Sequence, residues 1–479
     1  MPRETRQGEP AMAAVNIGTR RELFVDRFLI DSMRNVRLAL AHPERREVVF
    51  QGDAAWEDGA FFPYSLIQQD QCIRLYYRAA IPDRKHENIT IMALAESRDG
   101  GKSFIRPRLG LCELGGSTDN NILWQGGTPG IPPAFIDTNP ACPSEARYKG
   151  LDIEITSQYS RLFAMCSADG LRWRRMQERP LDMPGAFDSI NTAFWDEPAG
   201  CYRCYTRYYN PGVRSNGKDA RSVQMSTSDD FIHWSPPAPL EYEDGDASMQ
   251  LYTNSIQPCP GAEHIYVGFP NRYVEQRNKA AGAPPETRGV GYWGINDALF
   301  MASRDGLRWT RHREAWVRPG LDGRNWTHRN NYPAWHIIQT SPEEWSVLIS
   351  EHYMQKDGAP GRLRRLSVRP WGFAGVRAGF DGGEMLTRPL VFAGKSLHLN
   401  YSTSAAGSIQ VEMQGEGGQP IPGLGLDDME PLFGDELDGV VRWRGGGDLG
   451  HLAGRPVRLR FAMKDANLFA LRFGDAGKE

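Results

Sequence analysis

The sequence predicts an all-β protein: a five-bladed β-propeller followed by a C-terminal β-sandwich. A short turn motif recurs along the chain, each copy follows an apolar strand-like segment, and helical patterns are nearly absent. The 51 Gly and 33 Pro residues suit a chain of many short strands joined by turns. A length of 479 residues exceeds one ordinary core, so two domains are expected.

The repeated motif has the pattern Ser-x-Asp followed by an aromatic residue. It reads SADGLRW at 167–173, SDDFIHW at 228–234 and SRDGLRW at 303–309, with a looser copy, SRDGGKSF, at 97–104. In such a turn, Asp accepts hydrogen bonds from backbone amides, Gly adopts a positive φ, and the aromatic side chain packs back between sheets. The motif therefore predicts a structural turn within each repeat.

The spacing of these copies is typical of four-stranded propeller blades. A fifth unit without the motif spans 332–368, so residues 46–375 are predicted to form the propeller. We expect residues 1–45 to form an N-terminal segment packed on it. From residue 376 onward, segments such as 396–401 and 408–413 alternate apolar and polar residues with period two, which predicts a sandwich over 376–479.

Charge and composition argue against several classes of partner. The net charge of -3 and a pI near 6.4 indicate no basic face, so neither nucleic acid nor a membrane is an expected partner. The N-terminus has no apolar region of a signal peptide, and no stretch reaches transmembrane length, so the cytoplasm is the expected location. The sequence indicates no oligomeric state.

Neither a cofactor nor a metal is predicted. The seven cysteines are scattered and odd in number, and the pair Cys201 and Cys204 fits a strand of a reduced protein better than a metal site. His328, His336 and His352 could lie near a propeller axis, but their spacing matches no ligand pattern.

Several segments carry a resemblance to a known group of proteins. These are LFVDRFLI at 23–30, DNNILW at 119–124, FDSIN at 187–191, LYTN at 251–254 and PVRLRF at 456–461. Together with the blade layout, they resemble the five-bladed propeller glycoside hydrolases, which include families 32, 43, 62, 68 and 117. The added sandwich is most similar to family 32, and the nearest resemblance is to family-32-like bacterial proteins of unsettled activity. The resemblance implies a glycosidase, although the family-32 motifs W-M-N-D-P-N-G, R-D-P and E-C are not present.

Candidate catalytic residues follow from the geometry of a propeller, in which the starts of the inner strands converge at one end of the axis. Glycoside hydrolysis needs two carboxylates beside the bond. Asp58, Asp119 and Asp188 precede the inner strands of the first three blades, where the resembling families place their catalytic acids. Glu154 and Glu351, each at the end of a second strand, are alternatives for the general acid.

Sugar binding needs aromatic platforms and planar hydrogen-bonding groups near strand ends. The candidates of this kind are Trp56, Glu57, Arg78, Asn120, Asn121, Trp124, Asn191, Arg207, Asn254, Arg272, Asn331 and His352. The polar segment 274–289, rich in Gly and Pro, is a candidate lid or a plain insertion.

The leading hypothesis is a glycosidase or transglycosylase that acts on a small oligosaccharide. A family-130-like phosphorylase would share the five-bladed fold and need a phosphate pocket of Arg, Lys or His. A sialidase would share the turn motif, but sialidases have six blades, a clamp of three arginines and a tyrosine nucleophile. A propeller that only binds carbohydrate or protein is the alternative outside enzymes.

Overall fold

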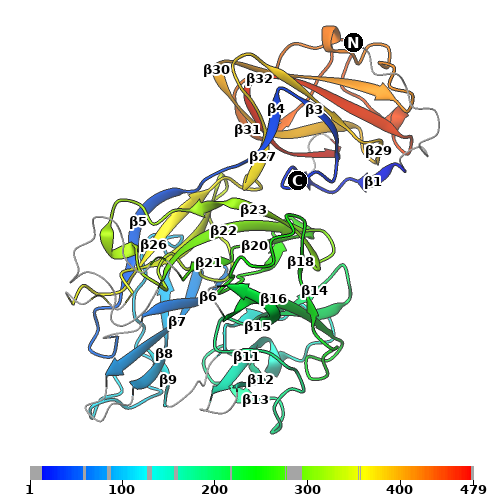
Figure 1. Cartoon of the computed structure of the whole chain (residues 1–479). Helices are drawn as coiled ribbons and strands as arrows, with labels where there is room; N and C mark the ends of the chain where they lie inside the picture. Colours follow the sequence, from blue (N-terminus) through cyan, green and yellow to red (C-terminus); the bar gives the residue numbers. More distant parts are fainter. Residues whose placement is uncertain are drawn as a thin grey trace. The chain divides into compact units, whose positions relative to one another are not determined.

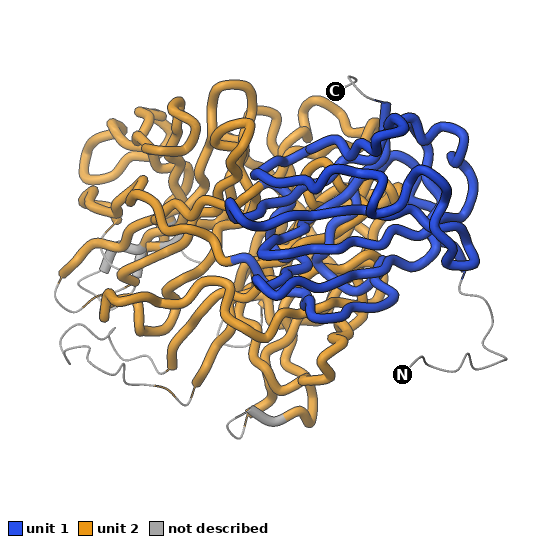
Figure 2. Tube along the Cα trace, turned by 90° about the horizontal axis from the view of Figure 1, so that it is seen from above, with its two compact units in different colours: residues 1–41, 370–479 blue, residues 42–369 orange. Residues whose placement is uncertain are grey.

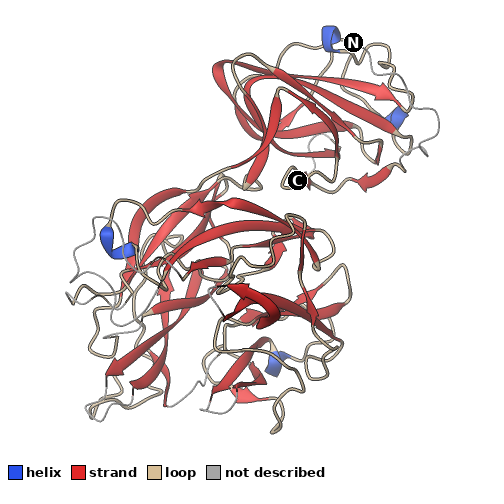
Figure 3. Cartoon of the chain, in the orientation of Figure 1, coloured by secondary structure: helices blue, strands red, loops and turns tan. Residues whose placement is uncertain are grey.

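The computed structural model describes residues 13–57, 61–82, 88–126, 132–155, 160–215, 218–275, 277, 294–353, 355 and 358–475. The chain divides into two compact units, His42–Arg369 and the pair of segments Met1–Ala41 and Pro370–Glu479 (Figure 2). Strands dominate both units, and the helical segments of the described chain are single 3₁₀ turns, such as η1 (Ser144–Ala146) and η3 (Gly323–Asn325) (Figure 3). None of these described helical segments is long and apolar enough to cross a membrane.

The unit His42–Arg369, unit 2 of Figure 2, is a five-bladed propeller, as predicted, and each blade is a separate sheet (Figure 1). Blade one contains β6 (Phe62–Gln69), β7 (Cys72–Pro82), β8 (Asn88–Ser97) and β9 (Ile122–Gly126). Blade two contains β10 (Phe135–Ile136), β11 (Tyr148–Ile155), β12 (Ser160–Ser167) and β13 (Arg174–Arg175). Blade three contains β14 (Thr192–Asp196), β15 (Cys201–Ser215), β16 (Lys218–Ser228) and β17 (Ala238–Pro239).

Blade four is larger than the first three. It contains β18 (Glu241–Tyr242), β19 (Gln257–Cys259), β20 (Ala262–Gly268), β21 (Asn271–Val274), β22 (Ile295–Ser303) and β23 (Arg308–Val317). Blade five contains β24 (Ile338–Ser341), β25 (Glu344–Glu351), β26 (Arg362–Val368) and β5 (Glu44–Gln51). Because β5 comes from the start of the unit and pairs antiparallel with β26, the two ends of the unit together close the ring.

A buried ion cluster accompanies this closure. The carboxylate of Glu351, at the end of β25, accepts hydrogen bonds from Arg45 on β5 and from Arg362 and Arg364 on β26. The Glu351 side chain is only 1% exposed, so three guanidinium groups compensate one buried charge. The cluster therefore joins β5 to β26, the strand with which it pairs in blade five.

The repeated turns have the predicted structure. In the copy at 167–173, the Gly170 amide donates to the Ser167 hydroxyl at 2.9 Å, and Asp169 accepts from the amides of Leu171 and Arg172 at 2.8 and 2.9 Å. Gly170 has a φ of 74°, and the Trp173 indole donates to its carbonyl oxygen at 3.0 Å. The same bonds recur at 228–234 and 303–309, with Phe231 in the glycine position at a φ of 67°.

The inner strands of blades four and five begin late in their segments. The sequence pattern over 252–257 and 332–338 is typical of strands, whereas β19 starts at Gln257 and β24 at Ile338. Ser255 and His336 have φ values of 43° and 79°, which interrupt the extended backbone before each strand. The residues before β19 and β24 therefore form irregular segments.

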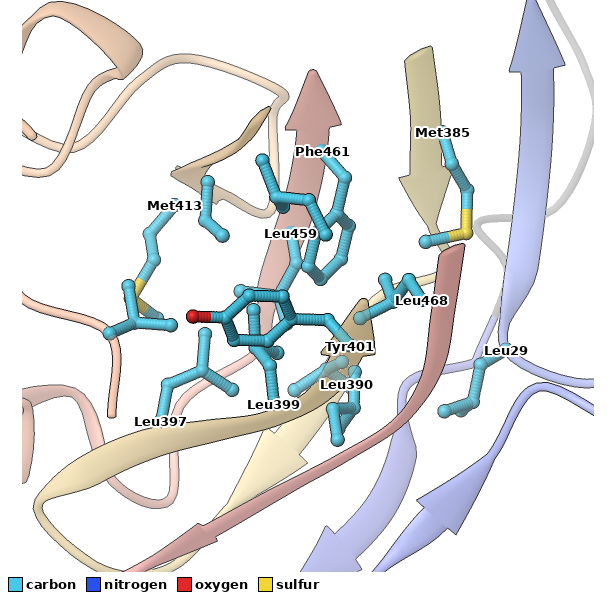
Figure 4. Close-up of a cluster of buried hydrophobic side chains, with 14 of the residues drawn as sticks. Leu29, Met385, Leu390, Leu397, Leu399, Tyr401, Met413, Leu459, Phe461 and Leu468 are labelled. Atoms are coloured by element: carbon cyan, nitrogen blue, oxygen red, sulfur yellow. The ribbon is translucent and has the colours of Figure 1, made fainter. Parts of the chain in front are cut away.

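The other unit, unit 1 of Figure 2, surrounds one hydrophobic core with ten hydrogen-bonded strands. Its two longest strands, β30 (Ser396–Gly415) and β32 (Val457–Gly474), pair antiparallel, and their side chains Tyr401, Met413, Leu459 and Phe461 belong to the core (Figure 4). The C-terminal part of the chain also supplies β27 (Ala374–Ala378), β28 (Gly383–Thr387), β29 (Leu390–Phe392) and β31 (Asp435–Val440).

The N-terminal segment belongs to unit 1 by strand pairing, in contrast to the expectation that residues 1–45 pack on the propeller. It supplies β1 (Val15–Gly18), β2 (Glu22–Leu23), β3 (Ile30–Arg34) and β4 (Val36–Leu40). These strands pair with β29, β32, β28 and β27, respectively. The physical reason is the core, because Ile17, Phe24 and Leu29 fill it with side chains that the C-terminal part does not supply.

Blade two holds a buried carboxyl group in the middle of β11. Asp152 is 2% exposed and accepts a hydrogen bond from the Ile153 amide at 2.7 Å. Burial raises the pKa of Asp152 to about 7, because the charged form loses its hydration. Asp152 therefore ionises near neutral pH at a cost to the folded state.

The ion cluster of blade five predicts the effect of Glu351→Gln. Removing the negative charge leaves three arginines around a neutral amide, so we expect a loss of about 3 kcal/mol in unfolding free energy, measured by urea titration. The matched control is Glu44→Gln, since Glu44 is 71% exposed and pairs with Arg46 on the same strand. It should change the free energy by less than about 1 kcal/mol. Equal effects of both variants would contradict the assignment.

The buried carboxyl group predicts a pH-dependent effect of Asp152→Asn. The folded-state pKa of Asp152 lies above its unfolded value, so wild-type stability falls as pH rises from about 4 to about 7. The asparagine variant does not ionise and should be more stable than wild type by about 3–4 kcal/mol at pH 8. The difference should vanish near pH 4, which urea titrations at both pH values can check. A difference independent of pH would contradict this prediction.

Candidate functional site

A pocket lies in the propeller, and residues of all five blades line it. The lining residues are Tyr64, Arg78, Thr90, Ile153, Ile155, Asp188, Ser189, Ile190, Tyr252, Thr253, Arg329 and Tyr332. A pocket to which every blade contributes lies at the axis, where the sequence predicted a site. We call it the axial pocket.

The residues that line the axial pocket lie at the positions in the blades that propeller geometry predicts. Asp188 and Tyr252 stand in the segments that precede the inner strands of blades three and four, and Arg329 stands before the inner strand of blade five. Arg78 lies on the second strand of blade one and Ile153 on that of blade two. The starts of inner strands and the later parts of second strands therefore meet at one end of the axis.

Asp188 is the carboxylate among the described lining residues. Its side chain is 50% exposed, and it accepts a hydrogen bond from Nη2 of Arg207, whose side chain is 3% exposed. Nε and Nη1 of Arg207 have no hydrogen-bond partner among the described residues. The Arg207 guanidinium also lies over the Tyr252 ring, 5.3 Å from its centroid. A buried cation thus holds an accessible carboxylate at the pocket wall.

Tyr252 lies among three guanidinium groups. Arg329 donates to the Tyr252 hydroxyl at 3.3 Å, and the Arg207 and Arg221 groups lie 5.3 and 5.4 Å from its ring centroid. Burial alone would raise the pKa of Tyr252, but Arg329, Arg207 and Arg221 together hold it below its ordinary value. The Tyr252 hydroxyl is therefore a better proton donor than an ordinary tyrosine.

Hydrogen bonds of its side chain and of its backbone hold Arg329 in place. Its guanidinium donates to the Tyr353 hydroxyl at 2.7 Å, and its backbone amide donates to Oδ1 of Asn296 at 2.7 Å. Its carbonyl oxygen accepts from the Ser350 hydroxyl at 3.2 Å. These bonds accompany a φ of 59°, an uncommon value for a bulky residue.

Three asparagines predicted to bind substrate instead hold the backbone around the pocket. Asn191 donates to the Phe187 carbonyl at 2.9 Å, and Asn254 donates to the Tyr205 carbonyl at 3.2 Å. Asn331 donates to the carbonyl oxygens of Asn296 and Asn325 at 3.0 and 3.2 Å. All three are buried, and these contacts support a positioning role.

The blade-one candidates form a separate buried network. Glu57 accepts from the Tyr77 hydroxyl and from Nε of Arg106, the latter at 2.9 Å. Asn121 accepts from the Trp56 indole at 3.0 Å and donates to the Tyr77 hydroxyl at 2.6 Å. None of these residues lines the described axial pocket.

The other two polar candidates near this network also lie outside the pocket. Asn120 bonds to backbone atoms of its own turn. Asp119 is an exposed partner of Arg108, with 3.0 Å between Oδ1 and Nε. Asp58 lies outside the described residues, as does most of the candidate lid segment 274–289.

The remaining candidates also lie apart from the described lining. Burial would raise the pKa of Glu351, but Arg364, Arg362 and Arg45 hold it below its ordinary value, the reverse of what a general acid needs. His352 bonds to Asp322 at 2.7 Å. Glu154 lies beside Arg175 and on the opposite face of β11 from Ile153. Trp124, on β9, is 44% exposed. Arg272 pairs with Asp297.

The structure thus brings together three of the predicted residues, Asp188, Arg207 and Arg78. It adds Tyr252 and Arg329, which the sequence analysis passed over. Both residues stand before an inner strand, as Asp188 does. Asp188 was found by searching these positions for acidic residues. A search of the same positions for tyrosine and arginine as well would have found Tyr252 and Arg329.

No protein-family model matches the sequence, and no curated protein does either. Among solved structures, the chain is similar to an N-acetylgalactosamine deacetylase from F. plautii in complex with blood group B trisaccharide, with 13% identity, 69% of this chain and 95% of that chain covered, and a TM-score of 0.40. It is also similar to a thermostable family-43 glycoside hydrolase, with 12% identity, 67% and 92% covered, and a TM-score of 0.42. A structure from the GH130 family, described as mannoside phosphorylases that include glycoside hydrolases targeting β-1,2 mannosidic linkages in Candida mannan, has 14% identity, 72% and 96% covered, and a TM-score of 0.38.

Proposed function

We propose that this protein is a glycosidase that binds a small glycan in the axial pocket and uses Asp188 as its reacting carboxylate. The observation that supports this is an accessible carboxylate, held by a buried arginine, in a concave site lined with tyrosines. Aromatic rings suit the apolar faces of sugars, while hydroxyl and guanidinium groups suit sugar hydroxyls.

The proposed chemistry pairs Asp188 with Tyr252 rather than with a second carboxylate. Asp188 accepts a proton from water while the water oxygen bonds to the anomeric carbon and the glycosidic bond breaks. The Tyr252 hydroxyl donates the proton that the leaving oxygen takes up, and Arg329 stabilises the phenolate that results. Return of the proton from Asp188 to Tyr252 restores the starting state.

A second candidate function uses the same two residues in different roles. In a sialidase-like reaction, the Tyr252 phenolate would bond to the anomeric carbon as the glycosidic bond breaks, and the leaving oxygen would take a proton from water. A second water, which loses its proton to Asp188, would then bond to the anomeric carbon and release the phenolate. The guanidinium groups around Tyr252 favour this possibility, because they stabilise the phenolate. The pH dependence of the rate distinguishes the two roles.

The carboxylate role predicts the effect of Asp188→Asn. We expect kcat for sugar release from an oligosaccharide panel to fall by about 10²-fold or more, because the amide cannot accept the proton. The melting temperature should change little, since the amide oxygen still accepts from Arg207. The matched control is Asp119→Asn, an exposed aspartate also paired with an arginine, which should keep full activity. Unchanged release by the Asp188 variant would exclude the proposed role.

The acid role predicts the pH profile and the effect of Tyr252→Phe. A proton donor must be protonated, so activity should decline as pH rises through the pKa of Tyr252, which lies below the ordinary tyrosine value. The phenylalanine variant should lose about 10²-fold in kcat and show no such decline. Rates measured from pH 5 to 10 check this. A wild-type rate that instead rises with pH, and that the variant loses, would favour the nucleophilic role.

A further inference from the structure

Blade three has a long hairpin beside the axial pocket. Its second strand, β15, has 15 residues, whereas β11, the second strand of blade two, has 8. β15 pairs with β16 from Tyr202 to Ser215, and Arg207, which holds Asp188, lies within this paired stretch. The hairpin therefore continues past the residue that holds the carboxylate of the pocket.

Tyr209 is the next side chain on the face of β15 that carries Arg207. Side chains alternate along a strand, so residues two positions apart share a face. Ile153 and Ile155 have the same spacing on β11, and both line the axial pocket. Tyr209 therefore lies beside the pocket, one step farther along its strand than Arg207.

Two arginines connect the Tyr209 ring to the pocket residue Tyr252. The Arg207 guanidinium lies over both rings, 5.6 Å from the centroid of Tyr209 and 5.3 Å from that of Tyr252. The Arg221 guanidinium lies 5.7 and 5.4 Å from the same two centroids. Contacts of this kind attract a ring to the cation and limit its motion. The Tyr209 ring is therefore held near Tyr252 and near the carboxylate that Arg207 binds.

The Tyr209 side chain is nevertheless open to solvent. It is 43% exposed, whereas Tyr202 and Tyr205 on the same strand are 2% and 0% exposed. A flat aromatic ring suits the apolar face of a sugar. A ring that is already held in place also loses little freedom when a ligand stacks on it. Tyr209 is therefore suited to bind a sugar next to the one in the pocket.

We propose that Tyr209 binds a second sugar unit, so that the substrate is an oligosaccharide that extends from the axial pocket along the hairpin of blade three. The inference rests on the proposed glycosidase function and adds a binding residue and a substrate class to it. The bond to be cleaved joins the sugar in the pocket to the sugar on Tyr209, because Asp188 lines the pocket and its partner Arg207 contacts Tyr209.

The test measures sugar binding by isothermal titration calorimetry in the Asp188→Asn variant, so that the probes are not consumed. The probes are glucose, galactose, mannose, xylose, arabinose and fructose, together with the disaccharides of each. For at least one sugar, a disaccharide should bind about tenfold or more tightly than the monosaccharide, because only the disaccharide reaches Tyr209. Adding Tyr209→Ala should remove this gain and leave the affinity for the monosaccharide unchanged.

Three further variants, each added to Asp188→Asn, serve as controls. Trp124→Ala should keep the gain, because Trp124 is 44% exposed and lies on β9 of blade one, outside the described lining of the pocket. Tyr209→Phe retains the ring and should keep the gain as well. Tyr209→Leu retains apolar bulk without a flat ring and should lose it. The leucine variant keeps the test valid if Tyr209→Ala fails to fold, which melting temperatures reveal.

Three results would overturn the inference. One is equal affinity for the disaccharide and the monosaccharide of every sugar. Another is a gain that survives both Tyr209→Ala and Tyr209→Leu. The third is the absence of binding by every probe.

Cleavage assays without the Asp188 substitution separate this inference from the proposed function. A disaccharide that Tyr209→Ala cleaves with the wild-type kcat/KM would retain the glycosidase and reject the Tyr209 site. A gain in binding that depends on Tyr209, without cleavage of any disaccharide by the wild type, would retain the Tyr209 site and reject the glycosidase.

Discussion

The propeller depends on a hydrogen bond between neighbouring blades that involves the repeated turn. The hydroxyl of Tyr76 in blade one donates to the carbonyl oxygen of Gly170 in the turn of blade two, at 3.0 Å. Tyr205 of blade three makes the same bond to Gly306 of blade four, at 3.1 Å. Both tyrosines are fully buried, so each bond satisfies a phenol and a carbonyl that water cannot reach.

Other contacts between neighbouring blades use different residues near the repeated turn. Between blades two and three, Nζ of Lys149 donates to the Tyr202 hydroxyl at 2.8 Å, and Phe231 fills the space that glycine leaves elsewhere. Between blades five and one, the turn of blade one approaches so closely that a Cβ on Gly101 would lie 2.7 Å from Ile338. Fixed joints of this kind set the angle between blades and therefore the positions of Asp188, Tyr252 and Arg329 at the axis.

The sequence predicts the features whose contacts lie within a few residues of each other. It does not predict the features that depend on contacts between distant parts of the chain. The turn motif predicts the blades because its hydrogen bonds lie within seven residues. The N-terminal strands could not be assigned, since β4 pairs with β27 more than three hundred residues away. Glu351 resembled a catalytic acid by its place at a strand end, but its partner Arg45 lies 306 positions earlier in the chain. Arg329 was overlooked because its role depends on a positive φ and on tertiary contacts with Asn296 and Tyr353.

Two carboxylate–arginine clusters in this propeller show how the same groups serve opposite purposes. At Glu351 the carboxylate is 1% exposed and the arginines around it are 21–30% exposed, so the anion is enclosed and the cations face outward. At Asp188 the carboxylate is 50% exposed and Arg207 is 3% exposed. Enclosure of the anion favours stability, since no ligand can reach it. Burial of the cation beneath an accessible anion favours chemistry, because the carboxylate is oriented and still meets whatever enters the pocket.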